Sequence, residues 1–247
     1  AQYRTVPLPP ANVTFDRATL TSYSFAVLWR PPKSQSEFDR YQISLGVKHS
    51  VPKIVLKDDQ RIAHFSEDLE PGRTYEVVVK TVSGNVASWP VTGNITTKPL
   101  PVNSLKAKPG KAGEITLDWL PNNESLQDSF MVKYHELEAY NSDGSVQVVQ
   151  DTHVHLVNLL AGRNYSISVV AISKNVQSLE TTVFQPTRPA SPVIEVLEPI
   201  SGKTLNVSWK WDVTSKQDSY KIIWTRNDTK QRREAVTKNN WMVLDGL

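Results

Sequence analysis

The stretch Leu69-Glu70-Pro71-Gly72-Arg73-Thr74-Tyr75 decides the fold, because a closely related stretch, Leu159-Leu160-Ala161-Gly162-Arg163-Asn164-Tyr165, stands 90 positions further along the chain. Three tryptophans keep the same spacing at Trp29, Trp119 and Trp209. Further pairs at this offset are Ser83 and Ser173, Val86 and Val176, and Pro99 and Pro189. A fixed period shared by so many markers is the signature of a repeat architecture. The 247-residue chain is therefore a run of repeats of about 90 residues.

Each repeat is made of strands rather than helices. Apolar residues alternate with other residues at Phe25, Val27 and Trp29, and the pattern returns at 75–79, 115–119, 165–169 and 205–209. Alternation with a period of two places one face of a strand in a core and the other in water. Further candidate strands lie at 41–45, 132–134 and 220–224. Short strands at regular spacing, separated by Pro, Gly and Asn, predict an all-β chain of sandwiches.

These markers resemble the fibronectin type III repeat: a Trp on the second strand, an aromatic residue on the third, and Leu-x-Pro-Gly-x-x-Tyr before the sixth. The last motif is complete at 69–75 and has Ala in place of Pro at 159–165. The resemblance implies tandem immunoglobulin-like β-sandwiches with a tyrosine corner, whose ring enters the core while its hydroxyl satisfies a nearby backbone group. We expect the inward aromatic residues to be structural core rather than ligand contacts. They are Trp29, Trp119, Trp209, Tyr75 and Tyr165.

Prolines mark the joints between repeats, at 96–101 and 187–192, and a similar signature occurs at 5–9. Proline fixes φ and removes a donor, so these linkers are expected to be short and semi-rigid. The expected repeats are 6–98, 99–188 and 189–247, with 1–5 as the end of a preceding repeat. The third is expected to be incomplete, because Leu247 aligns with Leu69 and Leu159 and the last two strands are missing.

Composition excludes several classes of protein. The net charge of +3 is too weak for a nucleic-acid binder, and no apolar run approaches the ~18 residues of a membrane helix. The chain has no cysteine, which excludes disulfides, thiolate metal sites and Cys nucleophiles, and argues against an antibody-type domain. No nucleophile elbow, phosphate loop or zinc-helix motif occurs, so we expect neither catalysis nor a cofactor.

Six Asn-x-Ser/Thr sequons suggest a chain that passes through the secretory pathway. With 14 Asn and 42 Ser plus Thr, chance predicts about 2.4 such matches. Strand parity points Asn206 to water between the inward Leu205 and Val207, and Asn164 precedes the inward Tyr165. The predicted N-glycosylation sites are Asn12, Asn94, Asn123, Asn164, Asn206 and Asn227. We expect the chain to lie on the extracellular side of the plasma membrane.

Two side-chain clusters could hold metal ions. His153 and His155 share one strand face, but no third ligand is evident, so surface histidines are favoured. The acidic groups Asp58-Asp59 and Glu67-Asp68-Glu70 fall in loops and are expected to be solvated, with calcium a remote alternative.

A basic stretch surrounds a predicted hairpin in the third repeat, at Arg226, Lys230, Arg232, Arg233 and Lys238. Bunched cations could bind heparan sulfate or an acidic protein. Because Asp228 and Glu234 lie in the same hairpin, an exposed and merely soluble hairpin is the favoured alternative.

A second resemblance covers essentially the whole chain and is more specific. Stretches such as Ser36-Glu37-Phe38-Asp39 and Tyr134-His135-Glu136-Leu137-Glu138, with 1–8, 12–17 and 80–84, resemble the ectodomain of insect receptor-type tyrosine phosphatases of the 10D type or their near paralogue. Differences in loops 33–35 and 48–50 leave the choice of paralogue open.

This resemblance implies a single-pass receptor in axon guidance and epithelial tube formation, with its phosphatase domain in the cytoplasm. That domain needs a Cys in its signature, so it must lie outside this chain. These repeats would then position or form a surface for a cell-surface or secreted protein ligand. A passive spacer and an adhesive or matrix array with no linked enzyme remain alternatives, although no Arg-Gly-Asp occurs to support integrin adhesion.

Overall fold

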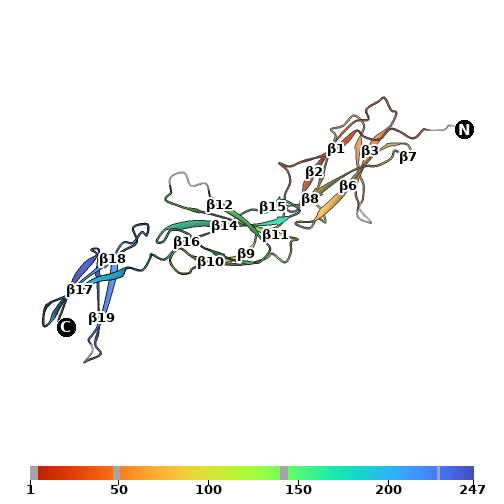
Figure 1. Ribbon diagram of the computed structural model, residues 1–247. Helices are drawn as coiled ribbons and strands as arrows, with labels where there is room; N and C mark the ends of the chain where they lie inside the picture. Colours follow the sequence, from red (N-terminus) through yellow and green to blue (C-terminus); the bar gives the residue numbers. More distant parts are fainter. Residues whose placement is uncertain (1–4, 47–50, 140–143, 227–228) are drawn as a thin grey trace.

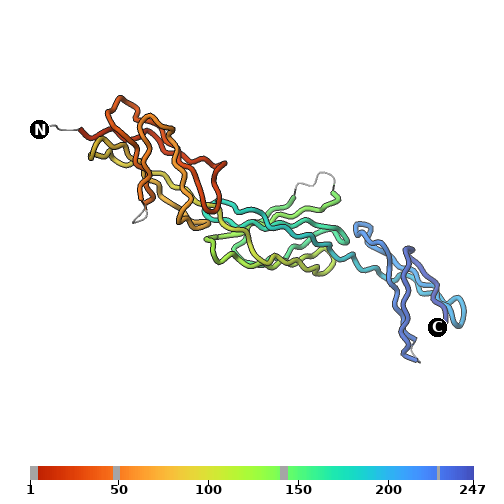
Figure 2. The backbone as a smooth tube through the Cα atoms, turned by 180° about the vertical axis from the view of Figure 1, so that it is seen from behind, coloured from red at the N-terminus to blue at the C-terminus, as the bar shows by residue number. Residues whose placement is uncertain are grey.

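Alternating strands build the whole of the described chain. The computed structural model describes residues 5–46, 51–139, 144–226 and 229–247, and contains 21 strands and no helix over those ranges. The strands form three β units that follow one another from end to end (Figures 1 and 2). The chain is therefore all-β, as its sequence predicts. Of the expected preceding repeat at 1–5, all but Thr5 lies outside the described residues.

The first sandwich packs a three-stranded sheet against a five-stranded one. The first sheet has the order β1-β2-β5, and the second has the order β4-β3-β6-β7 with β8 also paired to β6. The strands are β1 (Asn12–Asp16), β2 (Phe25–Arg30), β3 (Arg40–Leu45), β4 (Lys53–Leu56), β5 (Ile62–Phe65), β6 (Thr74–Ser83), β7 (Val86–Ala87) and β8 (Val91–Thr96). Trp29 lies between the sheets with its ring 5.4 Å from that of Tyr41.

The second sandwich repeats this arrangement strand for strand. Its sheets have the orders β9-β10-β13 and β12-β11-β14-β15, with β16 also paired to β14. The strands are β9 (Asn103–Pro109), β10 (Ile115–Leu120), β11 (Ser129–Glu136), β12 (Ser145–Val149), β13 (His153–Leu156), β14 (Asn164–Ser173), β15 (Val176–Gln177) and β16 (Thr181–Pro186). Trp119 packs edge-on against Phe130 at 5.5 Å, in the place that Trp29 and Tyr41 occupy before it.

The third unit has two smaller sheets. Its strands are β17 (Val193–Ser201), β18 (Thr204–Lys210), β19 (Tyr220–Thr225), β20 (Arg232–Thr237) and β21 (Trp241–Asp245). They pair as β17-β18-β21 and as the hairpin β19-β20. Trp209 packs against Tyr220 at 5.2 Å, yet only Val207, Trp209 and Leu244 of this cluster are fully buried. The core is thin here because the second sheet of this unit has only two strands within the described residues, β19 and β20. The corresponding sheets of the first two sandwiches have five strands each.

Tyr75 and Tyr165 have the geometry of a tyrosine corner. Both rings are buried, and each hydroxyl accepts the backbone N–H five residues upstream, from Glu70 at 2.7 Å and from Leu160 at 2.9 Å. The intervening glycine has a positive φ, of 71° at Gly72 and 66° at Gly162, which only glycine adopts at no steric cost. Each corner therefore ties the entry of the long strand β6 or β14 to the loop before it.

Candidate functional site: the joints between repeats and the exposed faces

The corner loop of the first sandwich is also the surface on which the second sandwich sits. Leu126 N–H donates to the Pro71 carbonyl at 3.0 Å, and the Ser173 hydroxyl donates to the Gly72 carbonyl at 2.6 Å. A Cβ atom at Gly72 would lie 1.9 Å from the Leu126 carbonyl oxygen. Gly72 thus serves two purposes, since it makes the positive-φ turn and leaves room for the backbone of the next repeat.

The second joint uses the same backbone contact 90 residues later. Lys216 N–H donates to the Ala161 carbonyl at 3.1 Å, and a Cβ atom at Gly162 would lie 1.8 Å from the Lys216 carbonyl oxygen. Leu126 and Lys216 have unrelated side chains, but the contact is made by main-chain atoms. The joint can therefore repeat while the side chains around it change.

A serine in the same loop holds the linker. In each repeat its hydroxyl accepts the N–H of the residue that follows the linker proline, at 2.9 to 3.0 Å. The three bonds are Leu8 to Ser36, Leu100 to Ser125, and Ala190 to Ser215. Corner, linker and loop consequently meet at one place, and the orientation of successive repeats is set by hydrogen bonds as well as by proline.

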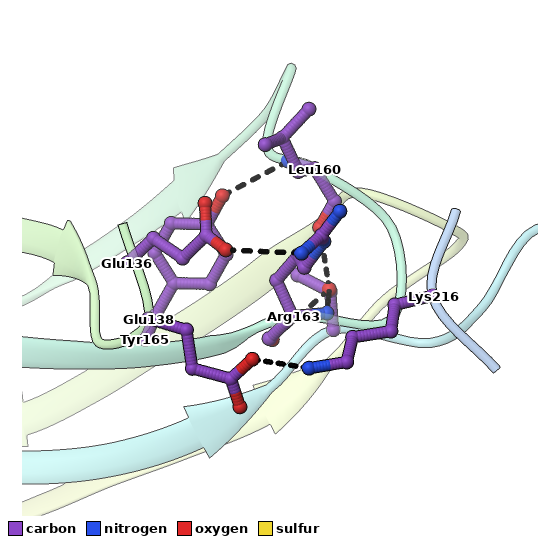
Figure 3. Close-up of polar contacts among 7 residues, drawn as sticks. Glu136, Glu138, Leu160, Arg163, Tyr165 and Lys216 are labelled. Carbon is purple, nitrogen blue, oxygen red and sulfur yellow. Dashed lines mark hydrogen bonds and ion pairs between the residues drawn. The ribbon is translucent and has the colours of Figure 1, made fainter. Parts of the chain in front are cut away.

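Charged side chains add to the second joint, as Figure 3 shows. The Lys216 ammonium donates to the Glu138 carboxylate, which joins the third unit to the second. This hydrogen bond, together with the charge of Lys216, holds the pKa of Glu138 below its usual range. Beside it, Arg163 and Glu136 form a less exposed ion pair at 3.5 Å within the second sandwich.

The positions of the joints were predicted from the prolines, but the hydrogen bonds that hold them were not, although the sequence carries a signal for these contacts. Ser125-Leu126-Gln127-Asp128-Ser129 returns as Ser215-Lys216-Gln217-Asp218-Ser219, again with an offset of 90. A repeated polar motif in a loop indicates a shared structural role. The hydrogen bonds of Ser125 and Ser215 identify that role as holding the linker.

The predicted glycosylation sites are distributed along the chain. Asn12, Asn94, Asn123 and Asn164 are exposed, whereas Asn206 is half-buried in β18, between Glu198 and Val243. Asn123 is beside the first joint, in the loop that carries Ser125, and Asn227 lies outside the described residues. Four of the six sequons therefore offer an accessible asparagine, and their occupancy stays a prediction.

The basic residues of the third unit do not form one patch. On β20, Arg233 is opposite Trp224 and Arg232 is opposite Thr225, so the two arginines point to opposite faces of the hairpin. Arg233 reaches inward to the Asp245 carbonyl at 3.4 Å. Lys238 follows the far end of β20, ~20 Å along the strand from Arg232. The structure brings Arg226, Lys230 and Arg232 toward the hairpin turn, and heparan sulfate binding stays a prediction.

The other candidate clusters lie on the surface. His153 and His155 are exposed on the outer face of β13, and His155 Nε2 is 3.3 Å from Glu114 Oε2. Asp58 and Asp59 occupy the turn between β4 and β5, and no group of three possible metal ligands occurs over the described ranges. Of the other acidic group, Glu70 forms an ion pair with Arg73 at 2.7 Å. The part of the chain that the structure describes contains no helix that could cross a membrane.

A three-stranded and a five-stranded sheet, closed by a tyrosine corner and repeated along one chain, define tandem fibronectin type III domains. Two family models bear this out: residues 8–94 match the fibronectin type III domain, and residues 109–189 match the Dep-1 second Fn3-like domain. The fold expected from the sequence is therefore confirmed.

The curated relatives of the chain include tenascins. It is 27% identical to mouse Tenascin-N over 96% of its own length, and 28% identical to human Tenascin-R over 81%. The chain spans only 15% of the length of either relative. Among solved structures, a two-domain fibronectin type III segment of chicken tenascin aligns with 72% of this chain and 99% of its own, at 20% identity and a TM-score of 0.46.

Proposed function

We propose that this chain is an extracellular segment of a single-pass receptor-type protein tyrosine phosphatase. The observation that carries the proposal is the match of residues 109–189 to a domain of Dep-1, a receptor phosphatase. In the proposal the catalytic domain is cytoplasmic and belongs to another part of the protein. The more specific assignment, to the insect 10D type or its paralogue with roles in axon guidance and epithelial tube formation, rests on the sequence resemblance.

The role proposed for the repeats is to position or form a binding surface for a cell-surface or secreted protein. The joints support a positioning role, because each is held by a corner-to-loop bond and a serine-to-linker bond. A chain joined in this way holds its repeats in a defined orientation, unlike a flexible linker. The exposed sequons at Asn12, Asn94, Asn123 and Asn164 support extracellular placement.

A second candidate is an adhesive or matrix array with no linked enzyme. The similarity to mouse Tenascin-N over 96% of this chain favours it. A passive spacer within a receptor is the third possibility, and it predicts that no single repeat is needed for ligand binding.

Antibodies raised against the folded chain separate the receptor from the matrix protein. The receptor hypothesis expects them to precipitate, from a detergent-solubilised membrane fraction, a longer protein with vanadate-sensitive phosphatase activity toward a phosphotyrosine peptide. Precipitation of an antigen that lacks this activity, from the detergent-insoluble matrix alone, would contradict it.

A cell-overlay assay then separates ligand binding from spacing. The whole chain is displayed as a bivalent fusion and compared with versions that lack one repeat at a time. Loss of cell binding on removal of a particular repeat supports a binding surface. Equal binding by every version, or by none, argues for the spacer.

A further inference from the structure

Asn164 lies near two exposed apolar side chains, Leu137 and Phe184, on the second sandwich. It is the first residue of β14, is exposed, and lies directly opposite Pro186 on β16. On the other side, Leu137 N–H donates to the Asn164 carbonyl at 2.9 Å. Because Tyr165 points into the core, Asn164 points outward, between Leu137 and Pro186.

An exposed aromatic ring lies within reach on the same face. Phe184 is 67% exposed and pairs with Ser166, two residues along β14 from Asn164. Such diagonal neighbours have Cα atoms ~7–8 Å apart, within reach of large groups. Leu137 is 47% exposed. Leu137 and Phe184 therefore place exposed apolar groups on two sides of Asn164.

The aromatic ring and the proline are missing from the equivalent place of the first sandwich, while residue 47, the equivalent of Leu137, lies outside the described residues. Residues 90 positions earlier are Thr74 for Asn164, Thr96 for Pro186 and Asn94 for Phe184. There, the Thr74 and Thr96 hydroxyls bond to each other at 2.7 Å. Of the two sandwiches, the second has Phe184 and Pro186 at these positions, and Asn164 of the sequon lies beside both.

We propose that Asn164 carries an N-linked glycan whose first N-acetylglucosamine packs against Phe184 and Leu137. The C–H face of a sugar is apolar and slightly positive, and it complements the negative face of an aromatic ring. The inference rests on the proposed extracellular placement, because the sugar is attached in the secretory pathway. The glycan would shield this part of the β11–β14–β16 face.

The attachment is a glycosyl transfer from a polyprenyl-pyrophosphate-linked oligosaccharide. The bond between sugar C1 and the pyrophosphate oxygen breaks, a bond from C1 to Asn164 Nδ2 forms, and Nδ2 loses one proton as the polyprenyl pyrophosphate leaves. The sequon residue Ser166 is only 7% exposed in the fold, between His135 and Phe184 on its two neighbouring strands. Transfer therefore precedes the pairing of β14 with β16.

Hydrogen exchange in the full chain tests the contact. The chain is secreted from cells that make only high-mannose glycans, site occupancy is measured by peptide mass spectrometry, and an endoglycosidase trims each glycan to one sugar. If the contact is worth as much as an aromatic pair, peptides of β14 and β16 should exchange about two- to tenfold more slowly than in Asn164→Gln. This difference should vanish when both chains also carry Phe184→Ser, an exposed change that leaves the core intact. The matched control Asn94→Gln should leave these peptides unchanged.

The outcomes separate this inference from the proposed function. Occupancy at Asn12 or Asn94 with none at Asn164 would overturn the inference and leave extracellular placement standing. If no sequon carries a glycan, the inference and the proposed extracellular placement are both overturned. Occupancy at Asn164 with the same protection in the Phe184→Ser background would show that the sugar does not use the ring.

Discussion

Replacing Gly162 with alanine should loosen the joint between the second and third units while both units stay folded. Gly162 has φ of 66°, and a Cβ atom would lie 1.8 Å from the Lys216 carbonyl oxygen. Real Cβ atoms essentially never lie within 3.0 Å of such an atom, so the joint has to open by more than 1 Å. The bond from Lys216 N–H to Ala161, now 3.1 Å, would then be lost.

The energetic cost divides between the repeat and the joint. The left-handed conformation costs alanine about 1–2 kcal/mol, which should lower the free energy of unfolding of the second sandwich by that amount. Loss of the joint hydrogen bond removes a further 0.5–1.5 kcal/mol or so from the contact between repeats. The second sandwich should therefore stay folded while the third unit takes a wider range of orientations.

Spin labels can measure this range, because the chain has no cysteine of its own. Labels placed at Lys106→Cys on β9 and Lys210→Cys on β18, both exposed, report the distance between the two units. The distance distribution should broaden in Gly162→Ala. The matched control is Gly113→Ala, where φ is 73° and the Cβ atom meets Leu159 of the same sandwich. This control should lower stability without altering the distribution, and an unaltered distribution in folded Gly162→Ala would refute the role of the joint.

Three further outcomes are expected. Tyr165→Phe removes the acceptor for Leu160 N–H and should cost about 1–3 kcal/mol in urea unfolding; an unchanged midpoint would show that water replaces the hydroxyl. Trp119→Ala should cost about 3–5 kcal/mol, and a loss below 1 kcal/mol would contradict a core role. The pKa of Glu138 is lowered in the folded chain. Its ion pair with Lys216 therefore strengthens the joint at any pH above the pKa of an ordinary glutamate, and this contribution is lost as the pH falls through the folded-state pKa of Glu138. The label distances should therefore broaden at low pH, and Glu138→Gln should broaden them at neutral pH and abolish the pH response.

The core could be predicted because its signals are local. The alternation of apolar residues places Tyr165 and Ile167 on the same, inward face of their strand, independently of distant residues. The tyrosine corner is equally local, because its hydrogen bond joins residues only five positions apart. The 90-residue offset then transfers each prediction from one repeat to the next. These features follow from strand geometry, which depends on neighbouring residues.

The contacts at the joints and the arrangement of side chains on the exposed faces could not be predicted in this way. The bond between Lys216 and Ala161 joins main-chain atoms 55 positions apart, and the repeated motif around Ser125 and Ser215 does not say which backbone groups it brings together. Five cations counted along the chain looked bunched, but strand pairing turns Arg232 and Arg233 to opposite faces. The nearness of Phe184 to Asn164 likewise depends on the register of β16 against β14.

The sequence by itself therefore determined that this chain is a series of fibronectin type III sandwiches, and it identified the aromatic residues of their cores. Both conclusions follow from the alternation of apolar residues along each strand and from the 90-residue repeat, which can be seen in the sequence alone. Only the tertiary structure decided how one sandwich meets the next and which side chains share a surface. Those relations depend on the pairing of distant strands and on main-chain atoms that every residue possesses. Gly72 and Gly162 illustrate the difference. The sequence motif predicts the turn that each glycine makes, but only the fold shows that a backbone carbonyl of the next repeat packs against it.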